Sequence, residues 1–478
     1  MADLRQIADV IRASSLNVAD KSEVALGRQF LKHLSMYGKM DGNHVKPVAT
    51  RGTIYLYNEA AGTWEEMKQD DALSLLQCYD GIEFDDDGKF AGTLAMRPAK
   101  CKNIHEAATL DLDHRDSEFF NAQPAGVAFK NGFVTVGADG IELHPRDPGH
   151  RATHCLPFDF NPEAECPEWN GVLRRVFARS ASPGDDAMLL QEFAGACLTG
   201  RAWQYAKCLI LSGGGNNGKS VVVETITEQL FPPSSVTYTS PQSWARPEFL
   251  SCLRDAKLNV ACEMPDSDIQ AGDVFKAVID GGAVMARNLY ENPYSFVPRA
   301  GHIFLANTLP GNRDNSEGFW RRVLVLGFGR NFSKDPDESG RLRTKEEVKQ
   351  SLQAELPGIA LWALHGARRL LRQGGYTVPT SHRVAVEEWR CDVDQVAAFL
   401  SECCLIDGAT THHSEIYRAF REWCESTGRQ VVGNRKLANR LRMLGVESGT
   451  DRNGLYFGLT VMLKASWGIG NGLKASGV

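Results

Sequence analysis

The sequence lacks the features that mark membrane and secreted proteins. No stretch reaches the ~18 consecutive apolar residues that a membrane-spanning helix needs. The first thirty residues contain no apolar signal-peptide core. The twelve cysteines include no C-x-x-C pair, so we expect reduced thiols rather than a zinc site or a disulfide framework. These absences lead us to expect a cytoplasmic protein with no membrane partner.

The sequence also has no low-complexity block and no excess of positive charge. Its formal net charge is −6, which argues against a generally basic coat that binds nucleic acid but not against a local basic channel. With 478 residues, of which 43% are hydrophobic, the chain is long enough for two to four globular domains.

What the sequence does contain is one phosphate-binding motif. Residues 213–220 read Gly-Gly-Gly-Asn-Asn-Gly-Lys-Ser and fit the P-loop template G-x-x-x-x-G-K-[ST]. An apolar run at 208–211 precedes it as a strand would. Residues 220–230 follow with apolar positions three and four apart, as in a helix. The alternative, a glycine-rich turn that happens to precede Lys-Ser, does not account for this context.

The motif has a clear chemical meaning. Glycines let successive backbone N–H groups point at phosphates, and the helix N-terminus adds positive potential. Lys219 would reach the β- and γ-phosphates, and the Ser220 hydroxyl would bind Mg²⁺. We therefore expect ATP and Mg²⁺ as ligands. The predicted nucleotide-binding residues are Gly213, Gly214, Gly215, Asn216, Asn217, Gly218, Lys219, Ser220 and Val221.

Further polar residues lie at the ends of apolar runs downstream. Glu263 ends one such run and is the predicted acid that holds Mg²⁺ or activates water, the alternative being an exposed acid at a strand end. Asn307 ends another and can orient the attacking water and sense the γ-phosphate. Arg321 and Arg322 directly precede a strand. An arginine delivered to a neighbour's γ-phosphate stabilises transition-state charge, whereas a surface ion pair is the ordinary alternative.

Patterns outside this motor divide the chain into further segments. A paired-aspartate reading of Asp111 and Asp113, as in the two-metal site of a primase, is disfavoured because the chain has little room for a palm domain ahead of the motor. The predicted segments are an α+β N-terminal module (1–170), a helical connection (171–200), an ATPase core (201–335), a helical segment with a linker (336–384), a winged-helix-like module (385–464) and a disordered tail (465–478).

The C-terminal module is expected to contain a basic helix at residues 434–444. Its leucines fall on one helical face and its basic residues lie off that face. Two helices precede it and a small hairpin follows, which suggests a winged helix. Contact with DNA phosphates and a merely solvated face are equally compatible with this pattern. The basic residues predicted to bind DNA here are Arg435, Lys436 and Arg440.

Taken in order, the motifs resemble those of the superfamily 3 helicases. The P-loop, the strand ending in Glu, a Lys–Gly-Gly hairpin segment, the strand ending in Asn-Thr-Leu-Pro and the Phe-Trp-Arg-Arg run all match. Within that superfamily the chain resembles the phage/plasmid primase-helicase C-terminal family, whose relatives include the poxvirus nucleoside triphosphatase. The resemblance extends over residues ~45 to ~462 and includes the segments 131–134, 166–169, 356–366 and 416–423.

This resemblance implies an α/β fold with an AAA+-like P-loop NTPase core, assembled as a hexameric ring with ATP between subunits. Such a ring translocates on single-stranded and forked DNA, and a separate primase or polymerase can act with it. Glu263 would be the Walker B acid, Asn307 the sensor, and Arg321 or Arg322 the arginine acting on the neighbouring subunit. Lys276 and Arg287 lie in the segment that faces DNA in the family.

Two departures from the family pattern stand out. Cys262 occupies the position before Glu263, where many relatives have a second acid. Glu291 stands at the expected hairpin tip in place of a lysine. The function implied is an ATP-dependent DNA helicase for phage or mobile-element replication, working in a bacterial host's cytoplasm if phage-encoded. The alternatives are a DNA-stimulated ATPase that acts as loader or clamp without unwinding, and a small-molecule P-loop kinase.

Overall fold

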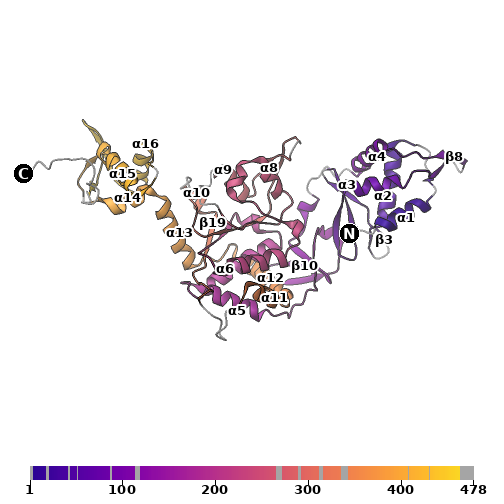
Figure 1. The fold of residues 1–478 in the computed structure, drawn as a ribbon, viewed down its shortest axis with the longest axis horizontal. Helices are drawn as coiled ribbons and strands as arrows, with labels where there is room; N and C mark the ends of the chain where they lie inside the picture. The colour runs from indigo at the N-terminus through magenta and orange to yellow at the C-terminus, as the bar shows by residue number, and fades with distance from the viewer. Residues whose placement is uncertain are drawn as a thin grey trace, which may run out of the picture.

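The computed structural model describes residues 4–462 except for 15, 18–20, 41–42, 51, 87–88, 113–118, 265–271, 289–291, 312–315, 335–342, 407 and 430. The predicted tail at 465–478 and the expected hairpin tip at Glu291 therefore lie outside the described residues. The molecule is elongated, with an N-terminal unit at one end, a large α/β unit in the middle and a small C-terminal unit at the other end (Figure 1). Within the described part, no helix is both long and apolar enough to cross a bilayer.

Within the described residues, the N-terminal unit packs four helices beside short strands. Ser22 caps the second helix by accepting a hydrogen bond from the Ala25 N–H. The unit has a hydrophobic core of its own, which reaches from Ile7 to Ala108. Its elements are α1 (Leu4–Ala13), β1 (Leu16–Asn17), α2 (Glu23–Ser35), β2 (Lys39–Met40), β3 (Asn43–His44), β4 (Val48–Thr50), β5 (Thr53–Asn58), β6 (Thr63–Met67), α3 (Gln69–Gln77), β7 (Glu83–Asp86), β8 (Lys89–Thr93) and α4 (Pro98–Asp111).

A four-stranded sheet follows in the order β11-β10-β9-β12. Gly132 opens its hairpin with a φ of 154°, where a Cβ would overlap the carbonyl of His144. Val127 and Val134 of this sheet share a core with the helices that follow and not with the N-terminal helices. The strands are β9 (Gly126–Phe129), β10 (Gly132–Val136), β11 (Ile141–His144) and β12 (Cys155–Leu156).

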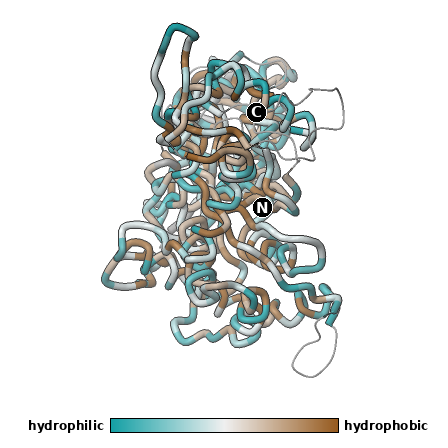
Figure 2. The backbone as a smooth tube through the Cα atoms, turned by 90° about the vertical axis from the view of Figure 1, so that its left-hand side faces the viewer, coloured by the Kyte–Doolittle hydropathy of each residue, from teal (hydrophilic) through white to brown (hydrophobic). Residues whose placement is uncertain are grey.

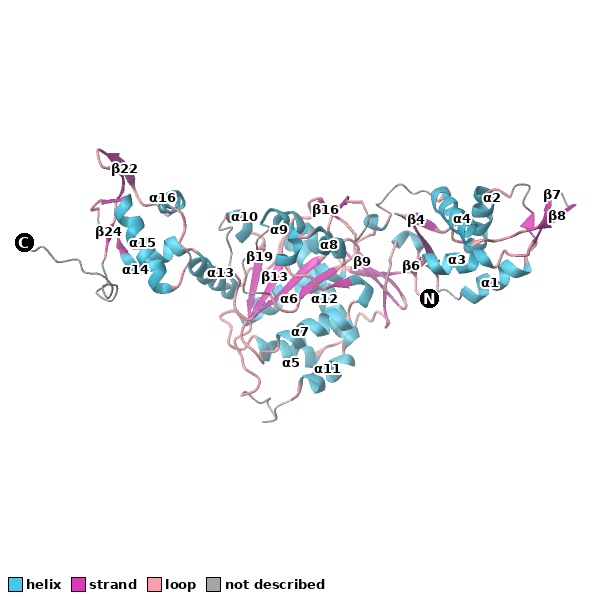
Figure 3. Cartoon of the chain, turned by 45° about the horizontal axis from the view of Figure 1, so that its top comes forward, coloured by secondary structure: helices cyan, strands magenta, loops and turns pink. Residues whose placement is uncertain are grey.

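The central unit is built on five parallel strands in the order β14-β15-β18-β13-β19 (Figure 3). Alternate residues of the middle strand enter different cores: Leu209 packs on one face and Ile210 on the other. The predicted α/β class is confirmed, and the central sheet is parallel. The strands are β13 (Cys208–Ser212), β14 (Val236–Thr237), β15 (Leu258–Ala261), β18 (Gly301–Ala306) and β19 (Val323–Gly327).

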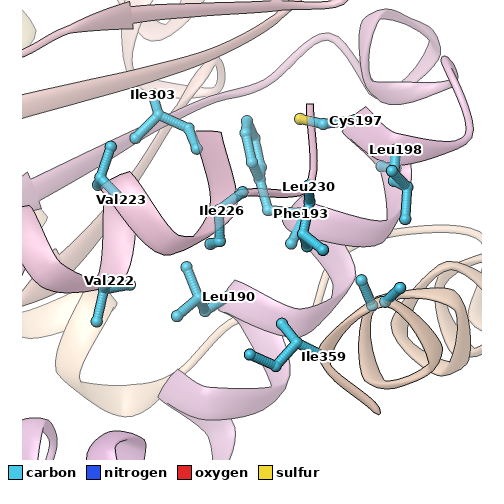
Figure 4. Packing of buried hydrophobic residues seen from close by; sticks show 14 of the residues in the cluster. Leu190, Phe193, Cys197, Leu198, Val222, Val223, Ile226, Leu230, Ile303 and Ile359 are labelled. Carbon is cyan, nitrogen blue, oxygen red and sulfur yellow. The ribbon is translucent and has the colours of Figure 1, made fainter. Parts of the chain in front are cut away.

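Helices cover both faces of this sheet. On the Leu209 face, Leu190, Phe193, Ile226 and Ile359 interlock (Figure 4). Helices from this face are α5 (Pro167–Val176), α6 (Pro183–Leu198), α7 (Lys219–Glu224), which a π-helical turn (Thr225–Gln229) extends, α11 (Lys345–Gln353) and α12 (Leu356–Gln373). On the Ile210 face lie α8 (Pro247–Leu250), α9 (Gly272–Ile279), α10 (Glu317–Trp320) and the hairpin β16 (Val284–Ala286) and β17 (Tyr294–Phe296).

The helices predicted as a connection at 171–200 are part of this central core. Helix α6 approaches α12 closely because Gly366 has no side chain, and a Cβ there would overlap the carbonyl of Gln191. The expected segment boundary at residue 170 therefore does not coincide with a break between cores. Amphipathic helices alone do not reveal which core they join. Along the backbone tube, hydrophobic stretches gather inside the molecule and hydrophilic ones occupy outer loops (Figure 2).

The C-terminal unit contains three helices and a small hairpin, and it has its own core around Phe399, Leu437 and Leu441. Helix α13 joins it to the central unit, where Trp389 packs edge-on against Trp320 with ring centroids 5.1 Å apart. The expected boundary at 384 falls inside α13. The elements are α13 (Thr380–Val393), α14 (Gln395–Cys403), β20 (Cys404–Leu405), β21 (Thr411–His412), α15 (His413–Thr427), α16 (Asn434–Met443), β22 (Ser448–Asp451), β23 (Gly454–Phe457) and β24 (Thr460–Val461).

Candidate nucleotide site

The predicted site residues converge because three neighbouring strands are parallel. β13, β18 and β15 lie side by side, so their carboxyl ends meet at one edge of the sheet. The loop before Lys219 leaves β13, Asn307 directly follows β18, and Glu263 lies two residues beyond β15. Lys219 and Asn307, which are 88 positions apart in sequence, thus line one pocket.

Glycine is required at defined points of the loop. Gly213 has a φ of 150°, and a Cβ there would overlap the carbonyl of Phe328. Gly218 has a φ of 88°, and Asn216 adopts the left-handed conformation with a φ of 57°. The Cβ positions of Gly214 and Gly215 meet nothing within 4 Å, so the middle of the loop leaves its backbone accessible. A ligand can therefore approach the main chain there.

Lys219 is a buried cation at the start of α7. Its side chain is 6% exposed, and its Nζ donates to the carbonyls of Gly213 and Gly214 and to Asn307 Oδ1, 3.5 Å away. Burial lowers the pKa of Lys219 below its usual value. The described residues offer this ammonium no carboxylate partner. An uncompensated buried charge of this kind fits an anionic ligand.

The pocket has a volume of about 190 Å³. That is room for phosphate groups rather than for a whole nucleotide, so a base and ribose would lie outside it. Val221 does not line the pocket and packs against the core below it. The lining residues are Gly214, Gly215, Asn216, Asn217, Lys219, Ser220, Cys262, Glu263, Leu305 and Asn307.

Glu263 supplies the carboxylate of this pocket, with Cys262 beside it in place of a second acid. Among the described residues, no three His, Cys, Asp or Glu side chains gather as a metal cage. Mg²⁺ is commonly held by one or two protein oxygens together with substrate phosphates. The Ser220 hydroxyl and the Glu263 carboxylate fit that donor set.

The segment after β19, which no motif identifies, holds the P-loop in place through two hydrogen bonds. After β19 the chain runs back under the P-loop, where the Phe328 carbonyl accepts from Asn217 Nδ2 at 3.0 Å and the Phe332 N–H donates to the Asn216 carbonyl at 2.7 Å. Asn217 is 4% exposed. In the sequence, Asn217 is only one of the variable residues of the P-loop template. Its hydrogen bond to the Phe328 carbonyl becomes visible only in the structure.

The two neighbouring arginines have different environments. Arg321 is exposed, and its side chain has no hydrogen-bond or ion-pair partner among the described residues. Arg322 is 5% exposed, and its guanidinium forms a bidentate ion pair with Asp280, with Nε 2.6 Å from Oδ1. It also donates to the Gly318 carbonyl. Arg321 alone is therefore available to another molecule in this conformation.

The residues predicted to face DNA in the motor lie on the Ile210 side of the sheet. Lys276 is half-buried in α9, close to Gly318. Arg287 follows β16 and pairs with Glu248 at 2.6 Å. The antiparallel pairing of β16 with β17 confirms the predicted hairpin. These cations lie away from the pocket that holds Lys219.

The basic residues of α16 also differ from one another. Arg435 and Lys436 are exposed. Arg440 instead donates twice to Asp394 Oδ2, at 2.8 and 2.5 Å. Asp394 caps α14 by accepting from the Ala397 N–H, so Arg440 joins two helices of the unit.

The disfavoured metal motif has no strand beneath it. Asp111 ends helix α4 and pairs with Arg28 at 3.2 Å, while Asp113 lies outside the described residues. Residues 98–111 form one uninterrupted helix with Pro98 in its first turn, which agrees with setting the paired-aspartate reading aside.

Comparison with known proteins gives two family matches. A family described as "D5 N terminal like" matches residues 34–178. A "Family of unknown function (DUF5906)" matches residues 211–322, which contain the pocket and both arginines.

Two viral proteins are similar in sequence. A putative helicase of Acanthamoeba polyphaga mimivirus, L207/L206, is 28% identical over 244 residues, which are 45% of this chain and 24% of that protein. A putative helicase of Invertebrate iridescent virus 6, 184R, is 30% identical over 141 residues, or 27% of this chain and 14% of that protein. The similarity thus covers less than a quarter of either relative.

Among solved structures, the apo C-terminal region of NrS-1 aligns over 62% of this chain and 68% of that one, at 14% identity. Its TM-score of 0.36 is too low to carry an argument about fold or function.

Proposed function

This chain is similar to a family described as "D5 N terminal like" and to two viral putative helicases, and from that premise we propose that it is an ATP-hydrolysing motor that unwinds DNA during replication of a phage or related mobile element. The observation that carries the proposal is the meeting of Lys219, Glu263 and Asn307 in one phosphate-sized pocket. The proposed motor acts in the cytoplasm of a host cell.

In this proposal the pocket binds the triphosphate of ATP. Lys219 leaves the loop carbonyls to hold the β- and γ-phosphates, and the N–H groups of the P-loop bind the remaining oxygens. Asn307 orients the attacking water, and Glu263 accepts its proton or acts through Mg²⁺. Bound Mg²⁺, held by Ser220 and Glu263, would neutralise charge on the phosphates. Among the described residues that line the pocket Glu263 is the one carboxylate, so in this proposal it serves both the metal and the water.

The strand order supports an AAA+-like core, because it sets the P-loop strand between the strand that leads to Asn307 and β19, which Arg321 precedes. We propose that copies of the chain form a ring, as a hexamer, in which Arg321 of one copy reaches the ATP of the next. The exposed guanidinium of Arg321, which has no side-chain partner in the described part of the chain, supports this step. Three helices followed by a hairpin likewise support a winged helix in the C-terminal unit that contacts DNA.

The site assignment is tested by ATP turnover with and without single-stranded DNA. Lys219→Ala should lower the turnover rate by about 10²–10³ or more, because it removes the charge that binds the phosphates. Glu263→Gln should keep ATP binding and lose hydrolysis. Lys102→Ala, an exposed lysine of α4, is the matched control and should turn over normally. Hydrolysis that survives Lys219→Ala at full rate would refute the assignment.

The second candidate is a DNA-stimulated ATPase that loads or clamps DNA without unwinding it. Strand displacement on forked DNA separates the two functions, with the Glu263→Gln protein as the control for passive melting. ATP-dependent displacement supports the helicase. DNA-stimulated hydrolysis with no displacement at any protein concentration would favour the loader.

A further inference from the structure

Helix α12 carries a line of aromatic and cationic side chains, none of which lines the nucleotide pocket. Trp362, His365, Arg368 or Arg369, and Arg372 follow one another at intervals of three and four residues, so they lie along one helical face. With a rise of 1.5 Å per residue, this line extends over about 15 Å.

Two cavities meet on this face. One, of about 480 Å³, is lined by His365, Arg368, Arg369, Arg372 and Gln373. The other, of about 340 Å³, also has His365 in its wall and reaches Trp362 and Asn170. His365 lies in the wall of both, and we call the two neighbouring cavities together the α12 groove.

The arginines of the α12 groove are not all neutralised. Arg369 pairs with buried Glu192 at 2.6 Å. Arg368 is held by main-chain carbonyls, those of Ala138 at 3.3 Å and Asp139 at 2.8 Å, and it has no carboxylate partner among the described residues. Arg372 is exposed and has neither a hydrogen bond nor an ion pair within the described part of the chain. Two guanidinium groups thus retain donors and charge for an anion.

The opposite end of the groove is aromatic and carries no such charge. Burial, followed by the nearby Arg368 and Arg369, lowers the pKa of His365, so its imidazole is neutral at pH 7. Trp362 is half-exposed. Glu165 lines that end and repels a second anion. Cations beside stacking rings match a phosphodiester with its base, whereas an acidic peptide would gain nothing from the rings.

We propose that the α12 groove binds single-stranded nucleic acid, with phosphates against Arg368 and Arg372 and a base against Trp362. The site lies on the Leu209 face of the central sheet, with α12 in that core, whereas the β16–β17 hairpin belongs to the core of the opposite face. It is therefore a contact separate from the one expected at the hairpin. It builds on the proposed motor only in that both take DNA as a ligand.

The test is equilibrium binding of the full chain to an oligo-dT strand by fluorescence anisotropy, without ATP, over a range of salt concentrations. Arg372→Gln should weaken binding a few-fold and lower the slope of log K against log salt by about one, and Arg368→Gln with Arg372→Gln by about two. Lys102→Gln, an exposed lysine of α4, is the charge-matched control and should change neither quantity. Since no ATP is present, failure here is distinguishable from failure of the hydrolysis assignment.

A second measurement locates the contact. A 4-thiothymidine oligonucleotide should cross-link to the peptide 356–373 in the wild-type protein and less in Arg372→Gln. Slopes that do not change in either variant, together with no cross-link on α12, would overturn the proposal. The proposal would also be overturned if polyglutamate bound the full chain and Arg372→Gln weakened that binding while binding of oligo-dT stayed unchanged. The groove would then serve an acidic polypeptide.

Discussion

Arg322, which is buried, and Asp280, which is partly exposed, form a bidentate ion pair that connects the start of β19 to the end of α9. The turn before β19 therefore directs the Arg322 side chain inward and the Arg321 side chain outward. The inward one holds two elements of the Ile210 face together. The outward one, Arg321, is left to act between molecules.

Replacing Arg322 should lower the stability of the protein, whereas replacing Arg321 should lower its ATP turnover. Arg322→Ala should lower the free energy of unfolding by about 2–3 kcal/mol, less than for a fully buried pair because Asp280 keeps part of its solvent contact. Arg321→Ala should leave thermal unfolding unchanged and reduce ATP turnover by about 10³ or more. Calorimetry and turnover measured on both proteins check this.

Mixing subunits tests where Arg321 acts. A Lys219→Ala subunit and an Arg321→Ala subunit are each inactive alone, but a mixed ring has interfaces with an intact lysine on one side and an intact arginine on the other. Partial turnover should therefore return in mixtures. No recovery at any ratio, in samples shown to exchange subunits, would count against catalysis across an interface.

Asn217 should matter for the shape of the P-loop rather than for chemistry. Asn217→Ala removes its hydrogen bond to the Phe328 carbonyl and leaves that buried oxygen unpaired, at a cost of about 1–3 kcal/mol. We expect a higher KM for ATP with a smaller change in kcat. Lys102→Ala, an exposed lysine of α4 that does not line the pocket, is the control. A kcat loss as large as that of Glu263→Gln would assign Asn217 a direct catalytic role instead.

The central sheet should lose stability in acid. Burial lowers the pKa of His302 to about 3, so between pH 6.5 and 3 the unfolded chain binds a proton that the folded chain does not. Stability is then fully present above pH 6.5 and falls by up to about 1.4 kcal/mol per pH unit below it. His382, with a pKa of about 4 from burial, contributes in the same direction.

Replacing His302 isolates its share of this effect. His302→Phe keeps a ring beside Trp244 and Phe304 and removes the titrating group. The Tm of this variant should fall less steeply between pH 6.5 and 5 than that of the wild type. Exposed His44→Gln serves as the control and should keep the wild-type slope. Equal slopes in all three proteins would contradict a buried neutral imidazole.

The C-terminal unit allows a clean separation of binding from folding. Arg435→Ala with Lys436→Ala should reduce DNA affinity and lower the salt slope by about two while the unit stays folded, because both side chains are exposed. Arg440→Ala should instead destabilise the unit, since Asp394 loses its partner. Binding isotherms and thermal melts of the full chain distinguish the two. Equal loss of affinity in both would return Arg440 to the DNA-contact set.

Local patterns in the sequence predicted most of the elements around the pocket. Short apolar runs with turn residues at their ends identified β13, β15 and β18, and polar residues beyond those ends identified Glu263 and Asn307. Parallel strands then bring such residues together without further information. The side chains that line the pocket are thus largely those that spacing predicts.

Pairwise partners could not be predicted in the same way. Nothing local distinguishes Arg321 from Arg322, because the choice depends on Asp280, more than forty positions upstream. In the sequence, Arg440 has the same charge and helical spacing as its solvent-facing neighbours. Only its ion pair with Asp394 distinguishes it from them. Helix α6 has the same limitation, since its periodicity shows that one side is covered but not that α12 covers it.

The position of β13 between β18 and β19 has a consequence for biosynthesis. As the chain emerges from the ribosome, the P-loop strand appears more than a hundred residues before the last of its two neighbours, β19, which ends at Gly327. In a nascent chain stalled before that point, β13 has no β19 to pair with. Asn217 of the P-loop then also lacks its hydrogen bond to the Phe328 carbonyl. If the proposed motor binds ATP at this loop, we expect that affinity only after residues 323–328 have left the ribosome.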